Sequence, residues 1–254
     1  MDILEAVKRH HELVEEKGHI VIMTSLIGSQ NYGLADDKSD IDTFSLTLPA
    51  FKDLASAREP VSKEFEVDDG KCVYKDIRIA LNLLKKTSPN SAEVFLSNWI
   101  YFNPIYEECL KEYLMNDMYL NYAVHSNYQH MLYACAGMAH QLTKRNMPAG
   151  KRYAHALRLK EMAYKYVDNF TVKDLFHLPE KVKQLALKAK RDPEHDEQYN
   201  DGCTSLANWL DAYLEAFNSK EVTVYNMEEI EHIGDLIISN CQVELLREYL
   251  KGEY

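Results

Sequence analysis

Gly28-Ser29, followed ten residues later by Ser39-Asp40-Ile41-Asp42, decides the fold. The apolar run before it, from His19 to Ile27, is short and rich in β-branched residues, and a glycine closes it. Such a run predicts a buried strand that ends in a tight turn. Ser29 then lies at or near the start of a helix, where free backbone N–H groups and the helix dipole attract phosphate oxygens. We therefore expect Gly28 and Ser29 to bind phosphate.

Two aspartates open the next predicted strand, which runs from Asp40 to Pro49 with alternating polarity. Residues two apart on a strand project from the same face, so Asp40 and Asp42 should point the same way. Paired carboxylates suit a hard cation such as Mg²⁺ or Mn²⁺. Beside a bound triphosphate, such a pair could place two metal ions for an in-line displacement. The alternative is a polar turn in which Ser39 and Asp40 bend the chain.

A hairpin is expected next, with strands Glu64 to Val67 and Lys71 to Asp76 joined by Asp69-Gly70 as positive-φ turn residues. Asp76 is a candidate third metal ligand and catalytic base, or else the N-cap of a helix that begins at Ile77. Asp69 is a second candidate, although aspartate before glycine is typical of a turn.

A cationic stripe is expected on a helix from about Gly150 to Asp168, where spacings of four and three place Lys151, His155 and Arg158 along one face. Arginine gives bidentate contacts to phosphate, lysine a point charge, and histidine a hydrogen bond or a titratable donor. These three residues are our candidates for binding a triphosphate. A solvated helix face is the alternative.

Three segments together resemble one family. They are Gly28 to Gly33 with Ser39 to Asp42, then Arg78 to Glu93 with its Pro89-Asn90 pair, and Lys151 to Arg158. They look like the DNA polymerase β superfamily of nucleotidyltransferases, and more narrowly like its predicted RNA-repair members in bacteria and phages. The resemblance implies an enzyme that moves an NMP from an NTP to a hydroxyl and releases pyrophosphate. It also implies Mg²⁺ or Mn²⁺ at Asp40 and Asp42, and Asp76 is our candidate for the third metal ligand.

The superfamily commonly uses a third carboxylate on a neighbouring strand, and this chain departs from that pattern. When the following helix is aligned on Arg78, Lys71 stands at the position expected for the acid. The departure supports an alternative function, a non-catalytic nucleotide-binding or protein-interaction module that retains the fold.

The organisation of the chain predicts an α+β fold with two domains. Residues 1–104 would form a nucleotidyltransferase domain, a mixed sheet with helices, and residues 105–254 an all-helical substrate-binding domain. The helical spacing of apolar residues predicts helices over residues 2–17, 77–86, 105–114, 119–144, 150–166, 179–190, 202–217 and 227–250. The polar segment from Arg191 to Gly202 is expected to be a loop.

The composition of the chain limits which partners and which cellular location we expect. The 254 residues carry a formal net charge of −11, which argues against broad, non-specific binding to DNA. The sequence has no apolar run long enough for a membrane span and no signal-peptide pattern, so we expect a cytoplasmic protein without membrane partners. Its five scattered cysteines indicate neither a disulfide framework nor a zinc site. The expected substrate is an NTP, and the acceptor an RNA end, a protein or a small molecule.

Overall fold

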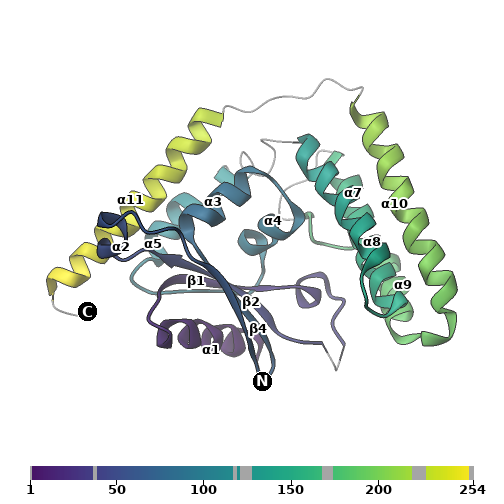
Figure 1. The fold of residues 1–254 in the computed structure, drawn as a ribbon, viewed down its shortest axis with the longest axis horizontal. Helices are drawn as coiled ribbons and strands as arrows, with labels where there is room; N and C mark the ends of the chain where they lie inside the picture. The colour runs from purple at the N-terminus through teal and green to yellow at the C-terminus, as the bar shows by residue number, and fades with distance from the viewer. Residues whose placement is uncertain are drawn as a thin grey trace.

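A five-stranded mixed sheet forms the centre of the N-terminal part of the chain (Figure 1). The computed structural model describes residues 2–36, 39–116, 119–120, 128–167, 174–218 and 227–251. The strands are β1 Ile20–Ile27, β2 Asp42–Leu48, β3 Ser62–Val67, β4 Gly70–Asp76 and β5 Ile100–Phe102. Their order in the sheet is β3-β4-β2-β1-β5, with β2 and β4 parallel and the other neighbouring pairs antiparallel.

Helices cover both faces of this sheet. The helices of the N-terminal part are α1 Ile3–Glu16, the 3-10 helix η1 Ser29–Tyr32, α2 Phe51–Ala55, α3 Ile77–Lys85 and α4 Pro89–Leu96. Helix α1 packs on one face, whereas α3 and α4 contact the sheet from the other (Figure 1). Ser88 and Ser91 form a capping box at the start of α4, which satisfies backbone groups that a helix end leaves free.

The C-terminal part is helical in every described segment. Its elements are α5 Glu107–Cys109, the π-helical turn η2 Leu110–Leu114, α7 Tyr128–Lys144, α8 Ala149–Val167, α9 Glu180–Arg191, the 3-10 turn η4 Pro193–His195, α10 Asp196–Asn218 and α11 Met227–Lys251. Helices α7 to α10 form a bundle beside the sheet, and α11 lies back over the N-terminal part (Figure 1). The mixed sheet followed by helices confirms the predicted α+β class.

One hydrophobic core runs through both parts. It joins Ile22 and Leu46 of the sheet to Met131 of α7, Leu159 of α8 and Ile237 of α11. Helix α11 packs on α3, α5 and η2, where the Sγ atoms of Cys109 and Cys241 lie 3.8 Å apart. The predicted domain boundary at residue 104 stays a prediction, and buried side chains on either side of it belong to the same cluster.

Most predicted elements lie within a few residues of the observed ones, and two local predictions are wrong. The hairpin turn consists of Asp68 and Asp69, because Gly70 is already paired with Val67, and Gly70 has no positive φ. A side chain at Gly70 would meet the backbone, since its Cβ would lie 2.2 Å from the Ile41 carbonyl oxygen. The glycine is therefore needed for close approach and not for the turn.

The predicted polar loop from Arg191 to Gly202 is largely helical. Asp192 accepts a hydrogen bond from the Glu194 N–H and so starts η4, after which α10 begins at Asp196, six residues before its predicted start. Tyr199 of α10 packs into a small cluster with Ala149 and Ala189, which explains why this polar stretch is ordered as helix. Among the helices of the described segments, none combines the length and apolarity that crossing a bilayer requires.

Candidate active site

The turn after β1 has the sharp geometry that the Gly28-Ser29 pattern predicts. Gly28 has a φ of 88°, in the region that favours glycine, and Gly33 closes η1 in the left-handed conformation. The helix that starts at Ser29 is only the four-residue η1, so its dipole adds little to phosphate binding. Ser29 itself lines a small hollow that also includes Lys151 and Arg158.

A buried glutamate holds this turn from α4. Glu93 Oε1 accepts a hydrogen bond of 2.5 Å from the Gly28 N–H and one of 3.2 Å from Asn31 Nδ2. Burial raises the pKa of Glu93, and the nearby positive charge of Arg158 opposes that rise. The Gly28 amide that we expected to face a phosphate is thus engaged by Glu93, which leaves Ser29 and the neighbouring cations to meet an anion.

Asp42 is the first residue of β2 and faces the turn. The register pairs it with Ile27 of β1, and a Cβ placed on Gly28 would lie 3.8 Å from Asp42 Oδ2. Burial raises the pKa of Asp42, and the negative charge of Asp40 adds to the rise. Asp40 lies two residues before the observed strand and is exposed, so the two carboxylates interact without sharing a strand.

Asp76 does not join this pair, contrary to the prediction that it serves as a third metal ligand and base. Because β2 and β4 are parallel, Asp76 lies beside Thr47, five residues along from Asp42 or roughly 17 Å. Its carboxylate caps α3 by accepting from the Arg78 N–H and pairs with the Arg78 guanidinium at 2.9 and 2.7 Å. The N-cap interpretation therefore holds.

The other candidate, Asp69, is also occupied elsewhere. Its Oδ1 lies 3.0 Å from His10 Nε2 and pairs with Arg9, both on α1. His10 Nδ1 lies 3.0 Å from Thr43 Oγ1, which places this cluster on the α1 face of the sheet. Alternation along β2 puts Asp42 on the opposite face, so Asp69 cannot share a cation with it.

Lys71 occupies the strand position beside Asp42. In the parallel register Thr43 lies beside Cys72, which makes Asp42 and Lys71 neighbours at the start of their strands. The Lys71 Nζ lies 3.3 Å from Glu64 Oε1 and 3.8 Å from Glu66 Oε1. The lysine that the sequence analysis placed at the position expected for the third acid thus lies beside Asp42.

Helix α8 brings the predicted cationic stripe to the turn. Arg158 is only 5% exposed, its guanidinium carbon lies 4.1 Å from the centre of the Tyr32 ring, and its Nε has no hydrogen-bond partner among the described residues. His155 is neutral near pH 7, because burial first and the charge of Arg158 second lower its pKa to about 3. It can exchange hydrogen bonds with a ligand, but its titration lies far below neutral pH. Lys151 is exposed at the mouth of the small hollow.

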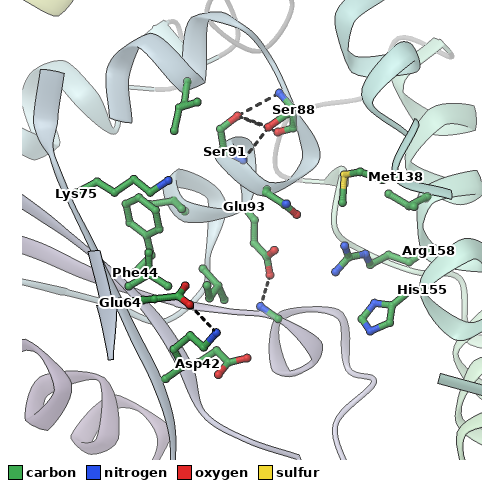
Figure 2. A pocket seen from close by; sticks show the side chains of 18 of the residues that line it. Asp42, Phe44, Glu64, Lys75, Ser88, Ser91, Glu93, Met138, His155 and Arg158 are labelled. Atoms are coloured by element: carbon green, nitrogen blue, oxygen red, sulfur yellow. Dashed lines mark hydrogen bonds and ion pairs between the residues drawn. The ribbon is translucent and has the colours of Figure 1, made fainter. Parts of the chain in front are cut away.

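Five residues described above line one cavity of about 630 Å³. They are Gly28, Asp42, Glu93, His155 and Arg158. Figure 2 shows Arg158 and His155 pointing from α8 across the cavity toward Glu93, with Asp42 and Glu64 on the opposite wall. Apolar side chains of β2, β4, α3, α4 and α7 form further parts of the wall. The cavity therefore lies between the carboxylates of the sheet and the cations of the helical bundle.

Lys190 of α9 is a residue of the small hollow that was not among the predicted site residues. Its Nζ donates to the Leu34 carbonyl at 2.6 Å and lies 3.5 Å from Asp36 Oδ2, while its side chain lines the hollow next to Ser29. Helices α8 and α9 can approach this closely because Gly150 has no side chain to meet the Ala189 carbonyl. The signal available in the sequence was the basic run of α9, which resembled an ordinary exposed helix face.

Two carboxylates that interact electrostatically, those of Asp40 and Asp42, are the residues that would hold a hard cation. The donor set does not fit a three-carboxylate site, since Asp76 and Asp69 are engaged elsewhere and Lys71 stands beside Asp42. Among the described residues, no three histidine, cysteine, aspartate or glutamate side chains gather in an arrangement that could hold a metal ion.

An aspartate that faces a glycine-serine turn, on a mixed sheet with helices, places the protein in the nucleotidyltransferase-like class of folds. Residues 2–239 match the family described as RlaP, RNA repair pathway DNA polymerase beta family, and the chain belongs to that family. This confirms the resemblance drawn from the three motifs and supports a general role in nucleotidyl transfer.

One solved structure is weakly similar to the chain. It is the nucleotidyltransferase-like protein from Exiguobacterium sibiricum, which is 13% identical and superimposes with a TM-score of 0.30 over 85% of this chain and 75% of its own. No curated protein matches the chain in sequence.

Proposed function

We propose that the protein is a metal-dependent enzyme that transfers an NMP from an NTP to a hydroxyl acceptor and releases pyrophosphate. One observation carries the proposal. A buried arginine, with a hydrogen-bonding nitrogen unused by any described residue, faces the same cavity as the aspartate beside the glycine-serine turn. A buried cation of this kind favours an anionic ligand, and a triphosphate provides one.

In this proposal one wall of the cavity binds the phosphates and the other binds the metal ion. Ser29, Lys151 and Arg158 hold the β- and γ-phosphates, and Gly28 contributes its turn geometry. Asp40 and Asp42 hold a Mg²⁺ or Mn²⁺ ion, which when bound neutralises charge on the phosphates and polarises them.

The reaction itself then requires positioning and one proton transfer. The acceptor oxygen bonds to the α-phosphorus while the bond from that phosphorus to the leaving pyrophosphate oxygen breaks. The acceptor proton passes to a solvent water, because Asp42 holds the metal ion in this proposal.

An RNA end is the acceptor we propose first, because the family is described as belonging to an RNA repair pathway. Arg145 lines the cavity, and Lys151 and Lys190 line the adjoining hollow, so local positive charge is available despite the net charge of −11. A protein or a small molecule remains the other acceptor to screen, and the acidic surface favours the small molecule over a long nucleic acid.

The test is to compare wild type with Asp42→Asn. We expect an NTP with Mg²⁺ or Mn²⁺ to raise the melting temperature of wild type, because a ligand that binds only the folded state stabilises it. Pyrophosphate release with RNA should fall at least about 100-fold in the variant, since a metal ligand supplies several kcal/mol of transition-state stabilisation.

The control is Asp68→Asn, which removes an exposed carboxylate from the hairpin turn and should leave both readouts unchanged. Turnover that survives in Asp42→Asn would sink the proposal. Lys71 beside Asp42 favours a second candidate function, a non-catalytic nucleotide-binding module. NTP stabilisation without pyrophosphate release, with every acceptor class, would support that function instead.

A further inference from the structure

Lys71 presents a fixed positive charge at the metal-binding end of the cavity. It is the second residue of β4 and lies beside Asp42, and both residues line the cavity. The charge of Lys71 lowers the pKa of Asp42 against the larger effect of burial. Their neighbouring positions place an ammonium where a third carboxylate would complete a two-metal site.

Two glutamates of β3 hold the Lys71 ammonium from the side away from Asp42. Glu64 lies closer, at 3.3 Å, and lines the cavity, whereas Glu66 is 3.8 Å away with 79% of its side chain exposed. The hydrogen bond and the charge of Glu64 raise the pKa of Lys71, so the lysine stays charged throughout the physiological range. The ammonium is therefore held by Glu64 at the cavity wall, where its charge acts on Asp42 of the neighbouring strand.

We propose that the Lys71 ammonium replaces the second divalent cation, so that the protein–nucleotide complex binds one Mg²⁺ or Mn²⁺ ion instead of two. The inference rests on the proposed function, because it concerns the same NTP complex. A second divalent ion beside Asp42 would be repelled by the ammonium and would find no free third carboxylate among the described residues.

The ammonium can supply part of what the second ion supplies elsewhere. A positive charge close to the attacking oxygen lowers the cost of the negative charge that develops as the acceptor proton leaves. A lysine is a single charge on a flexible stem with three donors, so it stabilises that oxygen less strongly than a divalent ion but needs no metal to be bound. The site would keep its electrostatic balance with one ion at Asp40 and Asp42.

The experiment counts bound Mn²⁺ by electron paramagnetic resonance in the full-length protein saturated with an NTP analogue that has a methylene bridge between the α- and β-phosphates. We expect one Mn²⁺ per wild-type complex and two per Lys71→Glu complex, in which the third carboxylate is present. Lys75→Glu is the matched control, since Lys75 lines the same cavity four residues further along β4, and its count should stay at one.

Two Mn²⁺ ions in the wild-type complex would overturn the inference, as would one ion in a folded Lys71→Glu complex. If Lys71→Glu fails to fold, the wild-type count alone decides. Analogue binding is measured in parallel by calorimetry. No binding to wild type would overturn the proposed function and this inference with it, whereas binding with two ions would overturn the inference alone.

Discussion

Single atoms set the position of the aspartate pair. The backbone N–H of Ile41, between Asp40 and Asp42, donates to the Asp69 carbonyl at 2.7 Å, and the Ile41 carbonyl lies against Gly70. The hairpin therefore holds the segment of Asp40 and Asp42 in place through backbone contacts. These contacts leave no room for a side chain at Gly70. Asp42 then depends on Gly70 for its place next to Gly28.

Gly70→Ala tests this dependence. The added methyl would lie 2.2 Å from a backbone oxygen, so either the hairpin or the aspartate segment must shift. Overpacking of this kind costs about 1–3 kcal/mol, and we expect NTP-dependent stabilisation to be lost as well. Chemical denaturation and nucleotide thermal shifts measure both effects.

Gly137→Ala is the comparison for that variant. Gly137 lies in α7, and among the described residues no atom lies within 4 Å of an added Cβ. Alanine should therefore stabilise the protein by about 0.5–1 kcal/mol and leave NTP binding intact. If Gly70→Ala behaves like Gly137→Ala, the hairpin does not position the aspartates.

The lowered pKa of His155 predicts how the free energy of unfolding depends on pH. Its folded pKa of about 3 lies below its ordinary value of 6.5, so the unfolded chain binds the proton more readily. The stability contributed by neutral His155 is complete above pH 6.5 and is lost as the pH falls toward 3. Between pH 6.5 and 5 the loss should be about 2 kcal/mol.

His155→Gln should flatten that part of the pH profile in urea unfolding. His177→Gln is the control because His177 is exposed, and its profile should follow wild type. An unchanged slope in His155→Gln would mean that other groups cause the acid sensitivity. His11 is one such group, since burial lowers its pKa to about 4.

The roles of single residues were partly predictable. The Gly28 turn and the nearness of Asp40 to Asp42 followed from residue types and spacing. The choice between ligand and N-cap for Asp76 required the register of β4 against β2, which depends on long-range pairing that no local pattern contains. Glu93 reaches Gly28 across 65 residues of sequence, and no local spacing links the two.

At the scale of elements, the crossing of α8 and α9 builds the cationic side of the cavity. Gly150 lets the two backbones meet, and Lys190 then reaches the loop after η1 at Leu34. Lys190 thereby ties α9 to the segment that leads into the aspartates, and it lines the hollow that contains Ser29. These contacts hold α8, α9 and the turn that contains η1 together.

Lys190→Met should weaken NTP binding about tenfold, the effect of losing roughly 1.4 kcal/mol of charge-assisted bonding. Lys188→Met removes the same charge from an exposed position on the same helix and should change affinity by less than about twofold, because exposed charges are screened. Isothermal titration with each NTP measures both. Equal effects of the two variants would reduce the role of Lys190 to general electrostatics.

The positions of helices and strands were more predictable from the sequence than the roles of single residues. The ranges of α1, β1, α3, α8, α9 and α11 follow the apolar spacing to within one or two residues. The start of α10 was missed because its first turn is polar and is stabilised by contacts from Tyr199 to α8 and α9, which are tertiary. Part of the helix predicted from Tyr119 to Lys144 lies outside the described residues.

At the scale of the whole molecule, α11 joins the end of the chain to its beginning. Ile237 is fully buried in the common core, and Gly234 lies close to Leu81 of α3. The bundle of α7 to α10 meets the sheet through α4 and through the turn at η1. The cavity walls are therefore parts of one packed body.

Ile237→Ala should destabilise the whole protein by about 2–5 kcal/mol, the range for a large-to-small change in a packed core. Leu250→Ala is the control, since Leu250 lies on the same helix with 76% of its surface exposed, and its effect should be within about 0.5 kcal/mol. Denaturant unfolding followed by circular dichroism gives both values. A small effect at Ile237 would mean that α11 packs only loosely.

The shared core also determines what a calorimeter would record. Side chains of the sheet and of the last described helix pack in one core, so melting should be a single cooperative event in which the calorimetric and van't Hoff enthalpies agree. A nucleotide held at one end of the cavity would then delay the loss of α11, which it does not touch. The temperature of the heat-capacity peak would therefore report whether the site is occupied, although the peak reflects unfolding of the whole molecule.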